Sequence, residues 1–484
     1  MKPREVYVYK TNSTSYPKPP FSPPEIYPEL KKTAPHDLDT ENQIYAAVRN
    51  LLIEMKLDEQ NLGTENWSPF RGMVKQGDTV IIKPNFAYHK HPLGEEGSFS
   101  VTTHASVIRP LIDYLLLATN KDCRIIICDA PLLTAYWDVI IKNMGFDRLV
   151  EYYETHNTRI SLVDLRYISA TMNDYDVITG RFSKKDLSYC IPVDLGNTSE
   201  LTPIIKHKKK FSITDYPGSE IEKHHNEIKN EYLIPKEILS AALFINVPKL
   251  KTHKKAGITV AMKNLIGINA DKRCIIHHRR GGVPGGGDEY PQLKVVSHLL
   301  WKAGQSARNN FPVIGTLLSL VKRLYIIIRY KDKNGFEKTR LKGAKDIINE
   351  GSWHGNDTLW RCIIDINNIL FYADKNGLLK EAIQRKYFCL VDGIIAGEGD
   401  GPVNPFPRPC GLLIAGTNPV AIDFACSRIM GFDWKKLPSI KHGFANRFFK
   451  LVDFTPEEVE IISNSGYIYE YFIPPTNWEQ LHIK

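Results

Sequence analysis

The densest group of side chains able to do chemistry lies between Asn246 and Pro291. From Lys249 to Arg280 this stretch has nine lysines and arginines but only one acid, Asp271. Two short glycine runs follow, and glycine allows backbone N–H groups to approach a ligand closely. Cations beside such glycines favour an anion site for phosphate or carboxylate, with a solvated basic loop as the alternative. We expect the anion to be bound here by Lys249, Lys251, Thr252, Lys263, Asn264, Arg279 and Arg280.

One histidine of this stretch is a candidate for proton transfer. His253 ends the sequence K-L-K-T-H, and an imidazole can act as acid or base near neutral pH. The glycines from Gly281 to Gly287 could either cradle the ligand or cover it as a lid. The stretch therefore predicts one wall of a site and leaves its closure open.

A second candidate combines carboxylates with glycines. Asp392, Glu398 and Asp400 lie within nine residues of one another and are separated by glycines. Oxygen ligands on such a loop suit magnesium, and the same carboxylates could serve with His253 as catalytic acids or bases. A solvated turn is the plain alternative, and the spacing does not match an EF-hand. Magnesium is the cofactor that these residues favour.

Four further polar residues stand at the ends of apolar runs or at the start of a helical pattern. Lys83, Asn85 and Asp129 lie at the ends of apolar runs, whereas His104 opens a helical pattern. In open α/β sheets, ligands bind outside the carboxyl ends of the strands, so these residues could converge on one ligand site. A turn or a helix cap is the alternative for each of them.

Apolar runs alternate with helical patterns along the chain. The runs, rich in Ile and Val, cover residues 79–86, 124–131, 243–250, 387–394 and 411–417. The helical patterns cover residues 44–55, 106–118, 137–144, 357–372 and 419–430. Continuous apolarity is typical of strands buried on both faces of a parallel sheet. The sequence therefore predicts an α/β fold, with a largely parallel central sheet flanked by helices and with inserted subdomains.

The same patterns divide the chain into three parts. Residues 1–74 are expected to form an N-terminal arm and a helix, and residues 436–484 a closing segment. Between them, residues 75–435 form the α/β core, with insertions at about 150–240 and 296–350.

Length and composition limit the class of protein. The chain has 484 residues, of which 43% are hydrophobic and 24% charged, which suits a well-packed globular core. The net charge of +9 is concentrated in a few stretches, and no nucleic-acid-binding motif is present. We therefore expect an anionic small molecule as the partner, and not a nucleic acid. The eight cysteines show no C-x2-C spacing, so an iron–sulfur cluster is not expected.

The sequence also bears on location. It shows no apolar signal segment at its N-terminus and no uncharged run long enough to span a membrane, so we expect a cytoplasmic protein. The segment from Phe311 to Tyr330 is apolar with three basic residues. It could form a peripheral membrane contact or, alternatively, a buried or docking helix. Nothing in the sequence indicates an oligomeric state.

Several of these motifs together resemble the family catalogued as domain of unknown function 362. The matching segments are KPNF at 83–86, TTH at 102–104, CDAP at 128–131, PKLKTH at 248–253, MKNLIG at 262–267, DGIIAGEGDGP at 392–402 and GTNPVAIDFACSRIMGFD at 416–433. The resemblance covers most of residues 75–435 and implies an α/β fold with a catalytic or cofactor-related role. Many relatives carry an appended ferredoxin-like domain with clustered cysteines, which this chain lacks.

Two weaker likenesses widen the range of functions. The segments GGGDEYP and GSWHGNDTLWR resemble a subgroup associated with surface-polysaccharide or natural-product gene sets. A more distant similarity is to nickel-dependent lactate racemases, which place lysines and histidines around a phosphorylated pincer cofactor. We expect an enzyme that acts on a phosphorylated or carboxylated small molecule. A cofactor-dependent oxidoreductase or racemase, and a non-catalytic binding protein of a membrane-proximal assembly, are the alternatives.

Overall fold

The computed structural model describes most of the chain. The described residues are 2–31, 37–158, 160–174, 177–213, 220–292, 303, 306, 311, 313–318, 320, 348, 350–445 and 447–483. Most of the predicted insertion at 296–350, and much of the segment expected to contact a membrane, lie outside them. Within the described ranges, no helix has the length and apolarity needed to cross a membrane.

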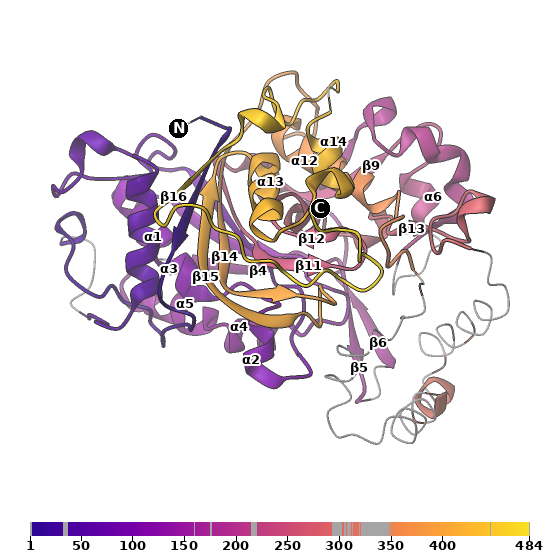
Figure 1. Cartoon of the computed structure of the whole chain (residues 1–484), viewed down its shortest axis with the longest axis horizontal. Helices are drawn as coiled ribbons and strands as arrows, with labels where there is room; N and C mark the ends of the chain where they lie inside the picture. The colour runs from indigo at the N-terminus through magenta and orange to yellow at the C-terminus, as the bar shows by residue number, and fades with distance from the viewer. Residues whose placement is uncertain are drawn as a thin grey trace.

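A ten-stranded sheet forms the centre of the molecule (Figure 1). Its main path runs in the order β16, β1, β15, β14, β10, β2, β3, β4, and β11 and β12 extend it from β14. The strands are β1 (Glu5–Lys10), β2 (Thr79–Pro84), β3 (Arg124–Asp129), β4 (Ile160–Asp164), β10 (Leu243–Val247), β11 (Lys249–His253), β12 (Gly257–Thr259), β14 (Lys386–Glu398), β15 (Phe406–Gly416) and β16 (Glu460–Ser463). Parallel pairs join β14, β10, β2, β3 and β4, whereas β15 is antiparallel to β14 and β1. The predicted α/β fold with a largely parallel sheet is confirmed.

The central strands are buried on both faces. Ile81 and Ile126 belong to the apolar core on one face of the sheet, whereas Ile82 and Ile127 belong to the core on the other. Successive side chains of a strand point to opposite faces, so a strand between two cores must be apolar at every position. This is why the strands appear in the sequence as continuous apolar runs.

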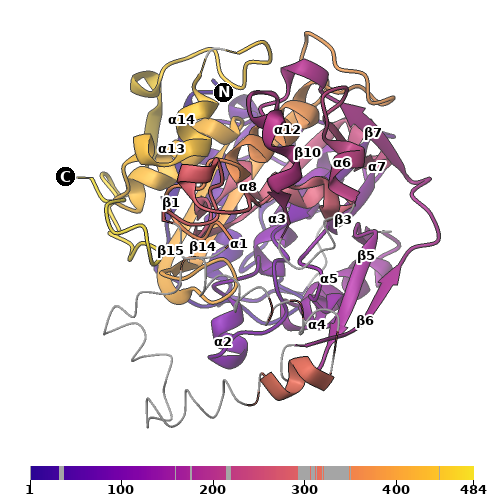
Figure 2. The same cartoon turned by 90° about the vertical axis from the view of Figure 1, so that its right-hand side faces the viewer.

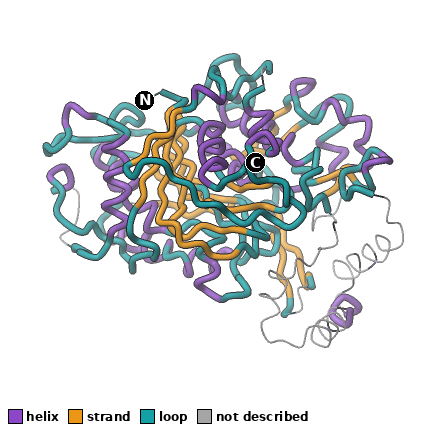
Figure 3. The backbone as a smooth tube through the Cα atoms, in the orientation of Figure 1, coloured by secondary structure: helices purple, strands orange, loops and turns teal. Residues whose placement is uncertain are grey.

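Helices cover both faces of the sheet, as Figures 1 and 3 show. The core on one face includes residues of α1 (Gln43–Glu54), α3 (Ala105–Ala118), α4 (Trp137–Asn143) and α5 (Phe146–Thr155). The core on the other includes residues of α7 (Lys236–Ser240), α8 (Ala261–Asn264), α12 (Leu359–Tyr372), α13 (Pro419–Ile429) and α14 (Pro438–Gly443). Two short helices, α2 (Gly94–Ser98) and α6 (Ile221–His224), lie in the connections.

Among the residues that the structure describes, three small antiparallel sheets lie outside the central one. They pair β5 (Ile168–Met172) with β6 (Ile178–Ser183), β7 (Cys190–Asp194) with β9 (Glu231–Pro235), and β8 (Phe211–Ser212) with β13 (His278–Arg279). Figure 2 shows β5 and β6 as a hairpin that extends at one corner of the molecule. Most of these strands fall in the region predicted as an insertion at about 150–240.

The segment PKLKTH differs from its predicted structure. One strand was expected over residues 243–250. The structure has two strands instead, because β10 ends at Val247 and β11 begins at Lys249 after Pro248. The long strand β14 pairs in parallel with both of them, through Cys389 to β10 and through Asp392 to β11. The lysines of this segment are therefore fixed in the sheet itself.

Candidate functional site

A cavity of about 350 Å³ lies where the carboxyl ends of β2 and β3 meet β11 and α8. Its titratable lining consists of Asp129, Lys251, His253, Lys254, Lys255, Lys263, Lys272, His277, Glu350 and Asp400. Apolar side chains complete the wall, among them Leu132, Leu133, Ile266 and Val403. A larger hollow of about 560 Å³ along the N-terminal arm has only one lysine in its lining. The concentration of cations therefore singles out the smaller cavity.

Burial shifts the protonation of these cations. It lowers the pKa of Lys263 to about 8, with Lys83 and Lys255 adding to the effect, and the pKa of Lys272 to about 7. Burial and the surrounding lysines also hold the pKa values of His253 and His277 well below the usual range. Both imidazoles are thus neutral at pH 7, and the two lysines are poised to lose or gain a proton. An anion in the cavity would favour the charged lysines again.

A buried ion pair stands beside this cavity. Lys83 Nζ lies 2.7 Å from Asp129 Oδ1, and both side chains are almost completely buried. The backbone N–H of Phe86 donates to the other carboxylate oxygen at 2.8 Å. Gly267 packs so closely that a Cβ at this position would lie 2.0 Å from Asp129 Oδ1. The glycine of the MKNLIG segment is therefore required by the close approach of the ion pair.

Three asparagine side chains connect the sheet to the cavity. Asn264 Nδ2 donates to Asn246 Oδ1 at 2.8 Å, and Asn85 Nδ2 donates to Asn264 Oδ1 at 2.8 Å. Lys83 Nζ also donates to Asn264 Oδ1, at 3.3 Å. Asn85, which lines the cavity, is left with its buried Oδ1 lacking a hydrogen-bond partner among the described residues. The asparagine chain thus ends beside the cavity with an unused acceptor.

A second ion pair, between Lys249 and Asp392, lies away from the cavity lining. Lys249 Nζ is 2.6 Å from Asp392 Oδ2, and both side chains are fully buried. Tyr16 of the N-terminal arm covers the pair: its hydroxyl donates to Asp392 Oδ1 at 2.6 Å and accepts from Lys249 Nζ at 2.7 Å. The backbone N–H of His104 donates to Asp392 as well, at 3.1 Å.

His104 has the role of a helix cap. Its Nδ1 accepts a hydrogen bond from the backbone N–H of Ser106 at the start of α3, and its ring stacks on Tyr16 at 4.2 Å between centroids. Burial, with the charge of Lys249, lowers its pKa to about 3. His104 is therefore a neutral packing group beneath the arm, and it does not line the cavity.

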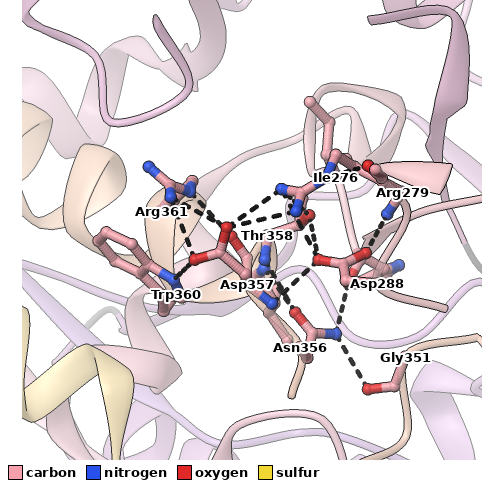
Figure 4. A network of polar contacts seen from close by, with 12 residues as sticks. Ile276, Arg279, Asp288, Gly351, Asn356, Asp357, Thr358, Trp360 and Arg361 are labelled. Atoms are coloured by element: carbon pink, nitrogen blue, oxygen red, sulfur yellow. Dashed lines mark hydrogen bonds and ion pairs between the residues drawn. The ribbon is translucent and has the colours of Figure 1, made fainter. Parts of the chain in front are cut away.

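The two arginines expected to bind the anion are engaged elsewhere. Figure 4 shows Arg279 between Asp288 and Asp357, at the start of α12. Its guanidinium donates to Asp357 Oδ2 at 3.3 Å and to Thr358 Oγ1 at 3.2 Å. Arg280 donates to the carbonyl of Lys209. Neither arginine lines the cavity.

The glycine loop after these arginines is folded upon itself. Gly281 N–H donates to Glu289 Oε2 at 2.9 Å, and Gly287 N–H donates to the carbonyl of Gly282 at 3.1 Å. A Cβ on Gly287 would lie 2.1 Å from the carbonyl oxygen of Gly281. The glycines thus serve close packing of the loop, and their N–H groups at these positions are used within it.

The structure does not bring the three expected magnesium ligands together. Asp392 pairs with Lys249, Glu398 lies 3.0 Å from Arg408, and Asp400 lies 3.2 Å from Lys254. In the described part of the chain, no group of three or more His, Cys, Asp or Glu side chains is placed to hold a metal ion. Each carboxylate instead neutralises a different cation.

Some of the predicted site residues thus line the cavity, and others do not. Among the predicted residues, its lining includes Asn85, Asp129, Lys251, His253, Lys263, Asn264 and Asp400. The remaining predicted residues lie outside the lining: Lys83, His104, Lys249, Thr252, Arg279, Arg280, Asp392 and Glu398. Lining residues absent from the prediction include Lys254, Lys255, Lys272 and His277, which belong to the same basic stretch, and Glu350. Because nearly all the charged residues of that stretch are positive, this pattern could have led to the prediction of Lys254, Lys255, Lys272 and His277 as well.

Comparison with known proteins finds a family model that matches part of the chain. Residues 197–428 match the model of the domain of unknown function DUF362. A thylakoid-associated protein of Synechocystis sp. is 24% identical over 211 residues, which are 44% of this chain and 39% of that protein. The match therefore spans well under two thirds of that relative. A crystal structure of a Thermotoga maritima protein, 13% identical, aligns over 81% of this chain and 59% of the other. Its TM-score of 0.32 is too low to bear on the fold. The match to the DUF362 model over residues 197–428 agrees with the family resemblance that the sequence motifs indicate.

Proposed function

We propose that this protein is an enzyme that binds a phosphorylated or carboxylated small molecule in the cavity at the strand ends. The observation that carries the proposal is the gathering of five lysines and two histidines around one cavity of about 350 Å³. Cations held in place before the reaction, and shielded from water, stabilise negative charge that develops on a substrate. Each of the three carboxylates of the lining is paired with a lysine. The lysines of the lining that have no carboxylate partner therefore give the cavity an excess of positive charge.

The apolar part of the lining indicates the rest of the ligand. Leu132, Leu133 and Val403 share the cavity with the lysines. Small-molecule sites commonly combine an apolar wall with a few polar groups that fix orientation. We therefore propose a ligand with one anionic group and a short apolar portion.

His253 is the proposed general acid. Its Nδ1 accepts a hydrogen bond from the backbone N–H of Lys255 at 3.0 Å. A neutral imidazole that accepts at Nδ1 carries its proton at Nε2, which can then donate. Lys272, with a pKa near 7, is suited to take up a proton at the same pH.

Calorimetric titration with phenyl phosphate, inorganic phosphate and benzyl alcohol tests the binding. Phenyl phosphate should bind most tightly because it engages both walls, and benzyl alcohol should not bind. Lys263→Gln should weaken phenyl phosphate binding about tenfold, the usual size of a lost charge-assisted hydrogen bond. Lys375→Gln is the matched control, because Lys375 is exposed in the connection before β14, at the opposite end of the strands. Equal binding by the neutral alcohol would contradict the proposal.

Enzymatic activity is tested by ¹H NMR in D₂O. Sugar phosphates and 2-oxo acids are incubated with the protein, and deuterium exchange or product formation is followed. The wild type should change at least one of these compounds, and His253→Gln should lose the change while still binding phenyl phosphate. Unaltered activity in His253→Gln would remove its acid–base role. Magnesium, a cytoplasmic location and a part in surface-polysaccharide or natural-product biosynthesis stay predictions from the sequence.

A further inference from the structure

The lysines of the cavity differ in what already holds their amino groups. Lys254 is paired with Asp400 at 3.2 Å, and Lys255 lies 3.6 Å from Glu350. An ammonium group that pairs with a carboxylate has no lone pair to offer an electrophile. These two lysines already have a carboxylate partner, and they are not the ones suited to attack a carbon atom.

Two more lysines donate hydrogen bonds to backbone carbonyls. Lys251 is fully buried, and its Nζ donates to the carbonyls of Val101 and Pro402. Lys272 Nζ donates to the carbonyl of Ile266 at 2.8 Å. Each amine is thus held against the wall of the cavity.

Lys263 is the exception. Its side chain is partly exposed and lines the cavity, and within the described residues it forms neither a hydrogen bond nor an ion pair. Burial, reinforced by Lys83 and Lys255 and opposed by Asp129, lowers its pKa to about 8. A desolvated lysine beside other cations in a partly apolar pocket is the form in which lysine acts as a nucleophile.

The backbone that carries Lys263 is firmly held on both sides. The buried carboxylate of Asp423 accepts from the backbone N–H of Ala261 at 2.7 Å, and Asn367 Nδ2 donates to the carbonyl of Met262 at 3.1 Å. The next residue, Asn264, is part of the asparagine chain beneath the cavity. The backbone beneath the unpartnered amine is therefore fixed. A nucleophile that must approach its target from one direction needs such a fixed support.

We propose that Lys263 forms an imine with an aldehyde or ketone group of the anionic ligand, an inference that rests on the proposed function. The lone pair of Nζ forms a bond to the carbonyl carbon, and the carbonyl oxygen takes a proton and becomes a hydroxyl. The resulting carbinolamine loses this hydroxyl as water, with a proton supplied by Lys272, and the C=N double bond forms. One water leaves for each imine, and neither an oxidant nor a reductant is needed.

The substrate class follows from this step. It is an oxo acid or a phosphorylated aldehyde or ketone, whose anionic group is held by the other cavity lysines while Lys263 reaches the carbonyl. An imine withdraws electrons from the neighbouring carbon, so the reaction would break a C–H or C–C bond there.

Reductive trapping with glyoxylate and sodium cyanoborohydride tests this step, because cyanoborohydride reduces imines to stable amines that peptide mass spectrometry locates. At pH 8, a lysine of pKa about 8 has a neutral fraction roughly a hundredfold larger than an ordinary lysine. Lys263 should therefore be labelled at least about tenfold faster than exposed Lys375, and phenyl phosphate should protect it. Labelling spread over exposed lysines, with Lys263 unmodified, would overturn the imine.

Lys263→Arg separates the nucleophile from the charge. Arginine keeps a cation but forms no imine under these conditions, so this variant should bind phenyl phosphate and show no cavity adduct. A cavity adduct that persists in the variant would assign the imine to another lysine and overturn the proposal. If the variant does not fold, protection of Lys263 in the wild type decides the question. If phenyl phosphate binds but Lys263 is not labelled, the imine proposal is wrong and the proposed function stands. If phenyl phosphate does not bind and Lys263 is not labelled, the proposed function is wrong as well.

Discussion

Two lysine–aspartate pairs of this protein look alike in the sequence and differ in their surroundings. Lys83–Asp129 and Lys249–Asp392 both join a β-strand lysine to a buried carboxylate, at 2.7 and 2.6 Å. Asp392 is covered by the Tyr16 hydroxyl, so that this pair is enclosed by protein on the side of the arm. Asp129 instead lines the cavity, beside an asparagine oxygen that has no partner among the described residues.

The difference separates a structural pair from a pair at a binding site. A buried ion pair is tolerated when hydrogen bonds satisfy the remaining lone pairs and protons. Tyr16, His104 and Asp392 meet that condition around Lys249 without any ligand. Lys83 is hydrogen-bonded as well, but its partner Asp129 borders a cavity that holds a surplus of positive charge. We therefore expect substitutions at the first pair to act on stability and those at the second to act mainly on binding.

The largest effect is expected from Lys249→Met. It leaves the Asp392 carboxylate buried without a cation, which should lower the free energy of unfolding by about 3–5 kcal/mol. Urea unfolding measures this loss, and calorimetry of the folded protein should show nearly unchanged phenyl phosphate affinity. The double variant Lys249→Met, Asp392→Leu should recover part of the stability, because it removes the uncompensated charge. Unchanged stability with lost binding would instead restore Lys249 to the anion site, as the sequence predicted.

Tyr16→Phe should have the next largest effect. It keeps the ring that stacks on His104 but removes the hydroxyl that contacts both charges, which should cost about 1.5–3 kcal/mol. Tyr9→Phe is a matched control, since the Tyr9 hydroxyl accepts only from Asn50 in a partly buried setting. Equal unfolding free energies for the two variants would show that Tyr16 does not stabilise the pair.

Gly267→Ala tests the other pair. The added Cβ would meet Asp129 Oδ1 at 2.0 Å and Lys83 Nζ at 2.6 Å, so one of these side chains must move. We expect a loss of about 1–3 kcal/mol in stability together with weaker phenyl phosphate binding. Gly72→Ala is the control, because a Cβ there meets no atom within 4 Å. If Gly267→Ala binds normally, the geometry of this pair is not part of the site.

The smallest effect is expected from a change in pH, which alters the affinity for an anionic ligand. Lys272 and Lys263, with pKa values of about 7 and 8, lose their charge as the pH rises past neutrality. The affinity for benzenesulfonate, whose own charge is constant, should fall about tenfold between pH 6.5 and 9, as calorimetry can show. Lys272→Gln should flatten the lower part of this curve, and a rise in affinity with pH would contradict the assignment.

The same two lysines predict the pH dependence of stability. Their pKa values in the folded protein lie below the ordinary 10.5, so the unfolded chain binds more protons between about pH 7 and 10.5. Their contribution should therefore make the unliganded protein more stable as the pH rises through that window. Urea unfolding of the wild type and of Lys272→Gln at several pH values isolates this contribution.

The central fold could be predicted because its strands are buried on both faces. The runs at 79–86 and 124–131 correspond to β2 and β3, since such strands need apolar residues at every position. The edge strand β16, which has four residues, and its neighbour β1, which begins with Glu5 and ends with Lys10, escaped prediction because neither is a continuous apolar run. β1 pairs with β15, and β16 pairs with β1, so the place of both strands depends on contacts between segments far apart in the sequence.

The candidate site was predicted in part for a related reason. The density of basic residues identified the stretch that supplies most of the cavity cations. It could not distinguish Lys249 from Lys251, because the residue that covers Lys249 is Tyr16, 233 positions away in the sequence. Arg279 was misjudged in the same way, since its partner Asp357 lies 78 positions further on. Charge patterns reveal where cations gather, whereas the fold decides which of them are already neutralised.

The chain of three asparagines has a consequence for selectivity. Each amide donates toward the sheet, from Asn85 to Asn264 and from Asn264 to Asn246, so the direction of the chain is fixed by its buried end. The Asn85 oxygen is therefore an acceptor left without a partner among the described residues. A ligand with an O–H or N–H group at that point satisfies it, whereas an otherwise identical ligand without one forfeits about 1–3 kcal/mol. The protein should thus distinguish a hydroxylated compound from its deoxy counterpart even though both carry the same charge.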